Sequence, residues 1–268
     1  MSQLSALFCL ARYNNEKYLI LFAGQLANGH NGLTGQRAQP MIISTNQPYF
    51  SPFPGFFYKA HLSDVFVVLD TVQFPRGTTW VSRNRFKNDQ GTLWLTVPVW
   101  KKGLGLQRIH EVRVCHEFRW VAKHLASFKI AYAKAPYFGE HLPFIQSTYL
   151  SRFEKIIDLN LALIRYLFEQ LKINTEIKLL SELGIQTAGN QMLVEICQTL
   201  GASVYLAQHA AKKFLDVGLF QQKGIQIQYI KPPACVYPQL WGAFVSNLSA
   251  FDLLFNCGPK AQDILKTG

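Results

Sequence analysis

The chain has 268 residues, of which 49% are hydrophobic, 13% aromatic and 16% charged. This composition excludes an intrinsically disordered chain, which would lack the side chains needed for a core, and the length suffices for one large domain or two small ones. The 27 Lys and Arg outnumber the 16 Asp and Glu, and the formal charge of +11 favours anionic partners such as phosphates, nucleotide-linked substrates or RNA.

The first forty residues differ in pattern from the rest of the chain. Two short apolar stretches are separated by polar residues, and a Gly- and Asn-rich loop follows at residues 28–36. No basic segment leads into a cleavage site, so we predict no signal peptide. Because a clear strand pattern starts at Met41, we predict that the domain comprises residues 41–268, and that residues 1–40 are an N-terminal extension or follow a mis-assigned translation start.

The segment that begins at Met41 alternates between strand and helix patterns. Residues 65–69 form a continuous apolar, mostly β-branched run, which is typical of a parallel strand covered on both faces. A loop rich in proline and aromatic residues precedes a short helix near residues 56–62. The predicted strands in this half of the chain are residues 42–45, 65–69, 93–99 and 112–114.

The middle of the chain carries apolar residues at helical spacing, and the predicted helices there are residues 118–132, 142–150 and 152–171. The last third returns to alternation, with strands predicted at 177–180, 204–206 and 225–229 and helices at 190–200 and 210–215. Short connections from strand to helix to strand are typical of a parallel sheet with helices on its faces. We therefore predict an α/β fold with a mostly parallel, Rossmann-like sheet flanked by helices and a helical insertion in the middle.

Open parallel sheets bind ligands beyond the carboxyl ends of their strands, and the loop at residues 46–55 follows the first predicted strand. Three prolines and three aromatic residues make it stiff. A stiff loop at a strand end suits the wall of a ligand site, and it equally suits a buried aromatic plug between sheet and helix. The candidate site residues of this loop are Gln47, Tyr49 and Phe50.

A second candidate segment follows the strand that ends at Asp70. That aspartate would be a metal-binding or general-base carboxylate, or it would merely cap a turn. Guanidinium groups bind phosphates through paired hydrogen bonds, and tryptophan offers a stacking face for a base or a sugar. An anion site is therefore predicted here, with a solvated basic loop as the alternative. Its candidate residues are Gln73, Arg76, Trp80, Arg83, Asn84 and Arg85.

Two weaker candidates lie near the C-terminus. Tyr237 and Gln239 follow the last predicted strand and would line the same pocket. Ser249 and Asp252 have the spacing of a capping box, and Gly258 before a proline would end the same helix, so we interpret these residues as structural.

The cysteines and histidines bear on the compartment and on metal binding. The five cysteines are scattered and form no C-x-x-C pair, which excludes a disulfide framework and a zinc ribbon and favours a reducing cytoplasm. No H-x-x-x-H pair occurs, so no metal site is predicted. No apolar run approaches the ~20 residues of a membrane-spanning helix, so no membrane span is predicted.

The segments described above resemble the WbqC-like protein family. Its Q-P-Y/N-F-x-P-x-x-G-Y/F run matches residues 47–56, and its W-x-x-R-N-R motif matches residues 80–85. The preceding D-x-F-V-x-x-D-x-V-Q-[FY] block has its counterpart at residues 64–74. Further matches lie at residues 94–99, 123–125, 135–138 and 248–258.

Two positions depart from the family pattern. Many relatives carry His or Met before the glutamine of the first motif, whereas this chain has Asn46, so no acid–base role is expected there. Relatives often have Y-L-S-G where this chain has residues 205–208 with Ala207 and Gln208 at the end, so the resemblance does not carry a phosphate-facing turn to residues 207–209.

Proteins of this family are often encoded among genes for O-antigen and related glycans, so the resemblance implies a role in surface-polysaccharide (lipopolysaccharide) biosynthesis. The hypothesis is a transferase that moves an acyl or aminoacyl group onto a nucleotide-linked amino sugar, with tRNA as a possible acyl donor. Asp70 and Gln47 would carry the reaction, Arg76 and Arg83 would hold phosphate, and Trp80 would stack. The alternatives are a non-catalytic nucleotide- or RNA-binding module and a scaffold for glycan assembly.

Overall fold

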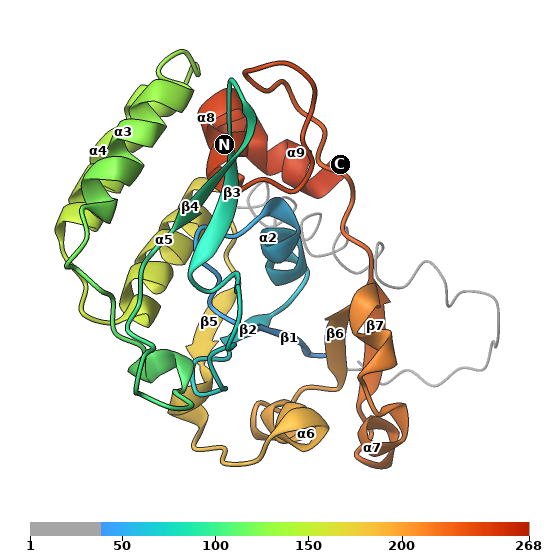
Figure 1. The fold of residues 1–268 in the computed structure, drawn as a ribbon. Coiled ribbons are helices and arrows are strands. Elements are labelled where there is room, and N and C mark those ends of the chain that lie inside the picture. The colour runs from blue at the N-terminus through green and yellow to red at the C-terminus, as the bar shows by residue number, and fades with distance from the viewer. Residues whose placement is uncertain (1–38, 268) are drawn as a thin grey trace, which may run out of the picture. The chain divides into compact units, whose positions relative to one another are not determined.

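The computed structural model describes residues 39–267, so the predicted extension at residues 1–40 lies outside the described residues except for its last two. A central sheet of five parallel strands has the order β5-β2-β1-β6-β7 (Figure 1). Its strands are β1 (Ile42–Asn46), β2 (Val65–Val68), β5 (Glu176–Leu179), β6 (Val204–Gln208) and β7 (Gln226–Ile230). The predicted α/β fold with a parallel sheet is thus confirmed.

Both faces of the sheet are covered, so nearly every residue of its central strands β1, β2 and β6 is buried. On one face Ile43, Val65 and Tyr205 pack in a cluster with α6 (Gly189–Thr199) and α7 (Val217–Gln222). On the other face Phe66 lies 4.9 Å, between ring centroids, from Phe56 of α2 (Pro54–His61). The same ring lies 6.0 Å from Phe168 of α5 (Ile156–Gln170).

The direction of the chain through the sheet reverses at β1. From β1 the chain crosses through α2 to β2 and later to β5, on one side of β1, and it then returns to β6 and β7 on the other side. A crevice opens beyond the carboxyl ends of the strands at such a reversal, and ligands of parallel α/β proteins bind there. The junction of β1 and β6 is therefore where a site is expected.

A long insertion separates β2 from β5. It holds an antiparallel hairpin of β3 (Arg83–Asn88) and β4 (Gly91–Thr96), then α3 (Trp120–Tyr132) and α4 (Phe138–Leu150), which lie side by side before α5 (Figure 1). The predicted helical middle of the chain is confirmed. The strand predicted at residues 93–99 is confirmed for residues 93–96, which belong to β4, but β4 pairs with β3 and stays outside the parallel sheet.

Three local predictions need correction. Residues 112–114 are not a strand, because Arg113 and Val114 make only isolated bridges to Lys155 and Val99. The helix predicted to start near Pro143 starts at Phe138 and contains the proline, which lacks one backbone donor but does not end the helix. Residues 209–213 form a 3-10 helix instead of an α-helix.

The remaining elements are short. The C-terminal segment folds into α8 (Ala250–Cys257) and α9 (Ala261–Thr267), and Gly258 ends α8 as predicted, with a positive φ of 51°. The 3-10 helices are η1 (Ile109–Glu111), η2 (Leu180–Leu183), η3 (His209–Lys213) and η4 (Gly258–Lys260). In the part of the chain that the structure describes, no helix is long and apolar enough to cross a membrane.

Candidate functional site

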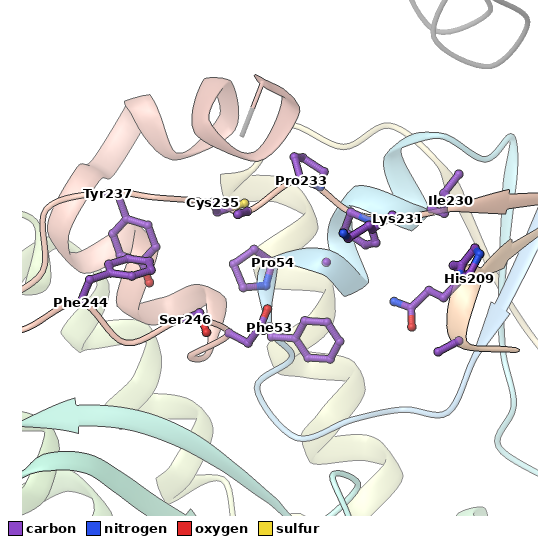
Figure 2. Close-up of a pocket in the computed structure, with 16 residues that line it drawn as sticks. Phe53, Pro54, His209, Ile230, Lys231, Pro233, Cys235, Tyr237, Phe244 and Ser246 are labelled. Carbon is purple, nitrogen blue, oxygen red and sulfur yellow. The ribbon is translucent and has the colours of Figure 1, made fainter. Parts of the chain in front are cut away.

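A cavity of about 580 Å³ lies at the reversal point of the sheet (Figure 2). Its walls come from four segments, which begin at Phe53 after β1, at Gln208 at the end of β6, at Ile230 at the end of β7, and at Tyr237 in the loop before α8. All four segments follow carboxyl ends of strands or the connection that leaves β7. The cavity therefore occupies the position that the topology of the sheet favours for a ligand.

The first turn of α2 forms one wall of this cavity. Pro54 occupies the start of the helix, where its missing N–H costs no helical hydrogen bond, and Phe53 before it supplies no side-chain cap. No acidic residue lies in the first turn, so no carboxylate compensates the partial positive charge of the helix start. Such a helix start attracts the negative charge of a phosphate or carboxylate.

Gly55 allows neighbouring side chains to pack closely against the first turn of α2. A Cβ atom at this position would lie 2.9 Å from the Phe53 ring and 3.2 Å from Cγ of Pro232. Both neighbours also line the cavity. The glycine is thus required by close packing at the cavity wall, since its φ is not in the left-handed region.

The two ends of the cavity differ in chemistry. His209 and Lys231 lie toward one end, and both side chains are exposed (Figure 2). Tyr237 and Phe244 lie at the other end, with ring centroids 5.8 Å apart at an angle of 88°. One end therefore presents cationic and proton-accepting groups, and the other presents aromatic surface.

Buried hydrogen bonds hold the aromatic end in position. The Tyr237 hydroxyl donates to Oδ1 of Asp252 at 2.8 Å, and Tyr132 donates to Oδ2 at 2.7 Å. Burial raises the pKa of Asp252, and its two tyrosine donors oppose that shift. Lys87 donates to Oε1 of Gln239 at 3.1 Å and to the carbonyl of Ala243 at 2.7 Å, so the loop that carries the aromatic end is tied to β3.

The capping box predicted at Ser249 and Asp252 is only half formed. Ser249 caps α8 by accepting from the Phe251 amide. Its own amide, however, donates to the carbonyl of Arg85 at 2.8 Å instead of to the Asp252 carboxylate. Asp252 points into the core toward the two tyrosines, because hydroxyl donors from distant helices and loops are available there.

Lys59 is a buried lysine that the sequence analysis did not single out. It lies on α2, one turn after Gly55, and is only 5% exposed. Its amine donates to the carbonyl of Thr45 at 2.7 Å and to Oδ1 of Asn46 at 2.9 Å. Burial lowers the pKa of this amine to about 7. The one signal in the sequence is a lone cation within an otherwise aromatic stretch of the helix.

Of the residues predicted as site residues, Tyr237 lines the cavity, and the others lie elsewhere. Asp70 is buried, and its Oδ1 accepts from the Ser181 amide at 3.0 Å. It borders a separate hollow of about 330 Å³ together with His110 and Asp158. Its hydrogen bond is that of a residue that orders the turn after a strand. The catalytic role remains a prediction.

Asn84 and Phe50 belong to the packing of the loop after β1. Asn84 is fully buried and donates to the carbonyls of Phe50 at 2.9 Å and Ser51 at 2.7 Å. Asn160 of α5 donates to the carbonyls of Pro48 and Val81 at 2.7 and 2.8 Å. The two asparagines therefore clamp the loop, and the Phe50 ring, with no exposed surface, fits the plug that was the alternative interpretation.

The remaining candidates of the first loop are partly buried. The Tyr49 ring lies 6.1 Å from that of Phe56, and burial raises the pKa of the Tyr49 hydroxyl. Gln47 is partly buried, and its carbonyl accepts from the Tyr49 amide at 2.9 Å. Gln239 accepts from Lys87 and so supports the cavity loop without lining the cavity.

The basic candidates lie on a different surface. Gln73 and Arg76 are exposed, and Arg76 borders a hollow of about 390 Å³. The structure brings Trp80, in the turn before β3, together with Arg83 and Arg85 of β3, and none of the three lines the cavity, although Arg85 donates to the cavity residues Ser246 and Asn247. Within the described residues, no group of three His, Cys, Asp or Glu is placed to hold a metal ion.

Comparison with known proteins gives a family. The sequence model of the WbqC-like protein family matches residues 47–264. The chain belongs to the WbqC-like protein family. It is also similar to the uncharacterized protein Rv1507c of Mycobacterium tuberculosis, with 29% identity over 226 residues that cover 84% of this chain and 97% of that protein. No solved structure matches the chain.

The match to the WbqC-like family includes every residue that lines the cavity, from Phe53 to Asn247. It also includes the hairpin that carries Trp80 and Arg83. The cavity and the hairpin thus both lie in the part of the chain that makes it a WbqC-like protein.

Proposed function

We propose that this WbqC-like protein is a cytoplasmic transferase that moves an acyl or aminoacyl group onto a nucleotide-linked amino sugar during surface-polysaccharide (O-antigen, lipopolysaccharide) biosynthesis. The observation that carries the proposal is the cavity at the reversal point of the parallel sheet, with a cationic end and an aromatic end. Sugar nucleotides have the matching chemistry, because an anionic diphosphate lies between a planar base and a sugar.

The diphosphate would bind where positive charge is available. The uncapped first turn of α2 and the exposed Lys231 both supply it. The aromatic end at Tyr237 and Phe244 offers flat surface for the base or the sugar. A volume of about 580 Å³ lies within the range of small-molecule pockets.

The transfer needs a group that removes a proton from the sugar amine. The amine attacks the carbonyl carbon of the activated acyl donor, its nitrogen loses a proton, and the leaving group departs with the electron pair. His209 is the cavity residue whose side chain is most suited to accept that proton, since histidine commonly acts as a general base near neutral pH. A charged tRNA is one acyl donor that the basic chain would suit.

Binding and variants test the proposal. A uridine-diphosphate amino sugar should raise the melting temperature of the protein. Lys231→Ala should weaken its binding about tenfold, the effect of losing roughly 1.4 kcal/mol from one charge-assisted contact. Arg76→Ala is the matched control, because Arg76 is also an exposed cation and lies outside the cavity. The reverse outcome, with Arg76→Ala harmful and Lys231→Ala silent, would move the site to the segment after Asp70.

The base is tested by product formation. His209→Gln should abolish acyl transfer while retaining nucleotide-sugar binding, and Asp70→Ala should not. If Asp70→Ala abolishes transfer without lowering the apo melting temperature, Asp70 is the base as the sequence predicted. A protein that binds nucleotide sugars but transfers no acyl group from any activated donor would be a non-catalytic binding module.

A further inference from the structure

Exposed tryptophan and positive charge are concentrated in one segment of the insertion, residues 73–108. This segment contains seven Lys or Arg, of which Lys87 is buried, and a single acidic residue, Asp89. It also contains Trp80, Trp94 and Trp100, which are 38%, 43% and 39% exposed. Large aromatic side chains are usually buried, so three exposed tryptophans in one basic segment indicate a binding surface.

Four of these side chains lie together on the β3–β4 hairpin and in the turn that precedes it. The ring centroids of Trp80 and Trp94 lie 5.7 Å apart at 33°. The Arg83 guanidinium lies 3.8 Å from the Trp94 ring centroid, and that of Arg85 lies 5.9 Å from Trp80 and 6.0 Å from Trp94. We call Trp80, Arg83, Arg85 and Trp94 the hairpin platform.

Further positive charge lies close to the platform along the chain. Lys101 donates to the carbonyl of Gly77 at 3.4 Å, three residues before Trp80. Lys101 and Arg76 border the same hollow of about 390 Å³. An anionic chain bound across the platform would therefore meet these cations next to Trp80.

The chemistry of this surface selects among possible partners. Tryptophan faces also stack on sugars, but a neutral glycan would gain nothing from the surplus of positive charge. A folded protein would bury the tryptophans but has no need for planar guanidinium groups stacked on them. Unpaired bases stack on tryptophan and arginine while phosphates meet the cations, and RNA is the nucleic acid that commonly presents unpaired bases to proteins.

We propose that the hairpin platform binds single-stranded RNA, with bases stacked on Trp80 and Trp94 and phosphates held by Arg76 and Lys101. The platform is distinct from the cavity, and the proposal stands without the transferase function. The two surfaces share one loop, because Arg85 donates to the carbonyls of Ser246 and Asn247, which line the cavity.

Fluorescence anisotropy with a labelled single-stranded RNA of about 12 nucleotides, a length within the range that single-strand-binding folds cover, tests the proposal. Replacing both tryptophans (Trp80→Ala with Trp94→Ala) should weaken binding about tenfold or more, the effect of losing base stacking. Phe214→Ala is the matched control, because Phe214 is 71% exposed outside the segment. The double alanine variant should fold. The hydrogen bond that position 80 makes to the Phe50 amide is accepted by the main-chain carbonyl of Trp80, which the substitution retains.

Two further variants guard against misfolding. Trp80→Phe with Trp94→Phe retains flat rings and should bind better than the double alanine variant. Lys101→Ala should lower the salt dependence of binding and leave the fold intact. Both results, together with circular dichroism spectra of the variants that match the wild type, are needed to support the proposal.

Several results would overturn the proposal. These are no binding at low salt, equal binding by the double alanine variant, equal competition by duplex RNA, or tighter binding of single-stranded DNA or an anionic glycan than of RNA. Nucleotide-sugar binding to the cavity should be unchanged in the tryptophan variants. A failure of RNA binding therefore leaves the proposed transferase untouched, and a failure of nucleotide-sugar binding leaves the platform untouched.

Discussion

The hydroxyl of Tyr237 donates to Oδ1 of Asp252 across 2.8 Å, and this bond joins the wall of the cavity to a carboxylate in the core. Asp252 is 1% exposed and also accepts from Tyr132 of α3. The position of the aromatic end of the cavity therefore depends on a buried polar cluster that involves α3, α8 and the loop between β7 and α8.

Removing the Tyr237 hydroxyl should destabilise the protein and loosen the cavity. Tyr237→Phe leaves Oδ1 of Asp252 with a longer contact to Asn256 at 3.4 Å. The free energy of unfolding, measured in urea, should fall by about 1–3 kcal/mol. The control is Tyr58→Phe, because the Tyr58 hydroxyl has no hydrogen bond among the described residues and should be nearly neutral. Equal effects of the two substitutions would mean that the bond to Asp252 contributes nothing.

Lys59 should make stability depend on pH in the alkaline range. Burial lowers the pKa of its amine from 10.5 to about 7, so the unfolded chain binds more protons between these values. The free energy of unfolding should therefore rise with pH across this window, by at most about 1.4 kcal/mol per unit. The neutral amine suits its surroundings, since its two N–H groups match its two acceptors, Thr45 and Asn46.

Urea unfolding between pH 7 and 10 measures this contribution. Lys59→Met should have a flatter pH dependence than the wild type, while Lys123→Met, at an exposed position on α3, should follow the wild type. Parallel curves for all three proteins would show that the Lys59 amine is charged in the folded state.

Adding a methyl group at Gly55 should narrow the cavity. Gly55→Ala places Cβ 2.9 Å from the Phe53 ring and 3.2 Å from Pro232, so these groups must move. The expected destabilisation is about 1–3 kcal/mol, with weaker binding of cavity ligands. Gly139→Ala is the matched control in α4, where a Cβ meets nothing within 4 Å. It should stabilise the protein by about 0.5–1 kcal/mol, because alanine is the better helix former. Stabilisation by both substitutions would contradict the close packing at α2.

Asn84 should be essential for the fold of the loop after β1. Asn84→Asp has the same shape but cannot donate to the carbonyls of Phe50 and Ser51, and it would place a buried negative charge beside them. A loss of about 3 kcal/mol or more is expected in thermal or urea unfolding. Asn88→Asp, on the same hairpin, retains the oxygen that accepts from the Gln90 amide and should change little. If Asn84→Asp and Asn88→Asp have the same melting temperature, the hydrogen bonds of Asn84 do not hold the loop in place.

Local pattern predicted most of the architecture. β2 was recognised as a continuous apolar run and β1 by the two isoleucines with which it starts, because parallel strands covered on both faces are rich in apolar side chains. β3 was missed, because its buried positions are Asn84, Phe86 and Lys87, and these do not alternate as apolar and polar residues do in an ordinary strand. Burial there depends on partners from distant segments, such as the Tyr132 hydroxyl that accepts from the Lys87 amide.

The candidate site, like the fold, was predicted from the sequence only in part. The sequence by itself determined the family, the parallel α/β class and the strand ends at which ligands bind. It also pointed to Tyr237 and to the loop after β1, because strand ends are visible in local pattern. Only the tertiary structure decided that residues near Phe53, Gln208 and Lys231 enclose one cavity while Asp70 and Arg83 lie outside it. The physical reason is that strand order sets which strand ends are neighbours, and strand order depends on packing between segments far apart in the chain.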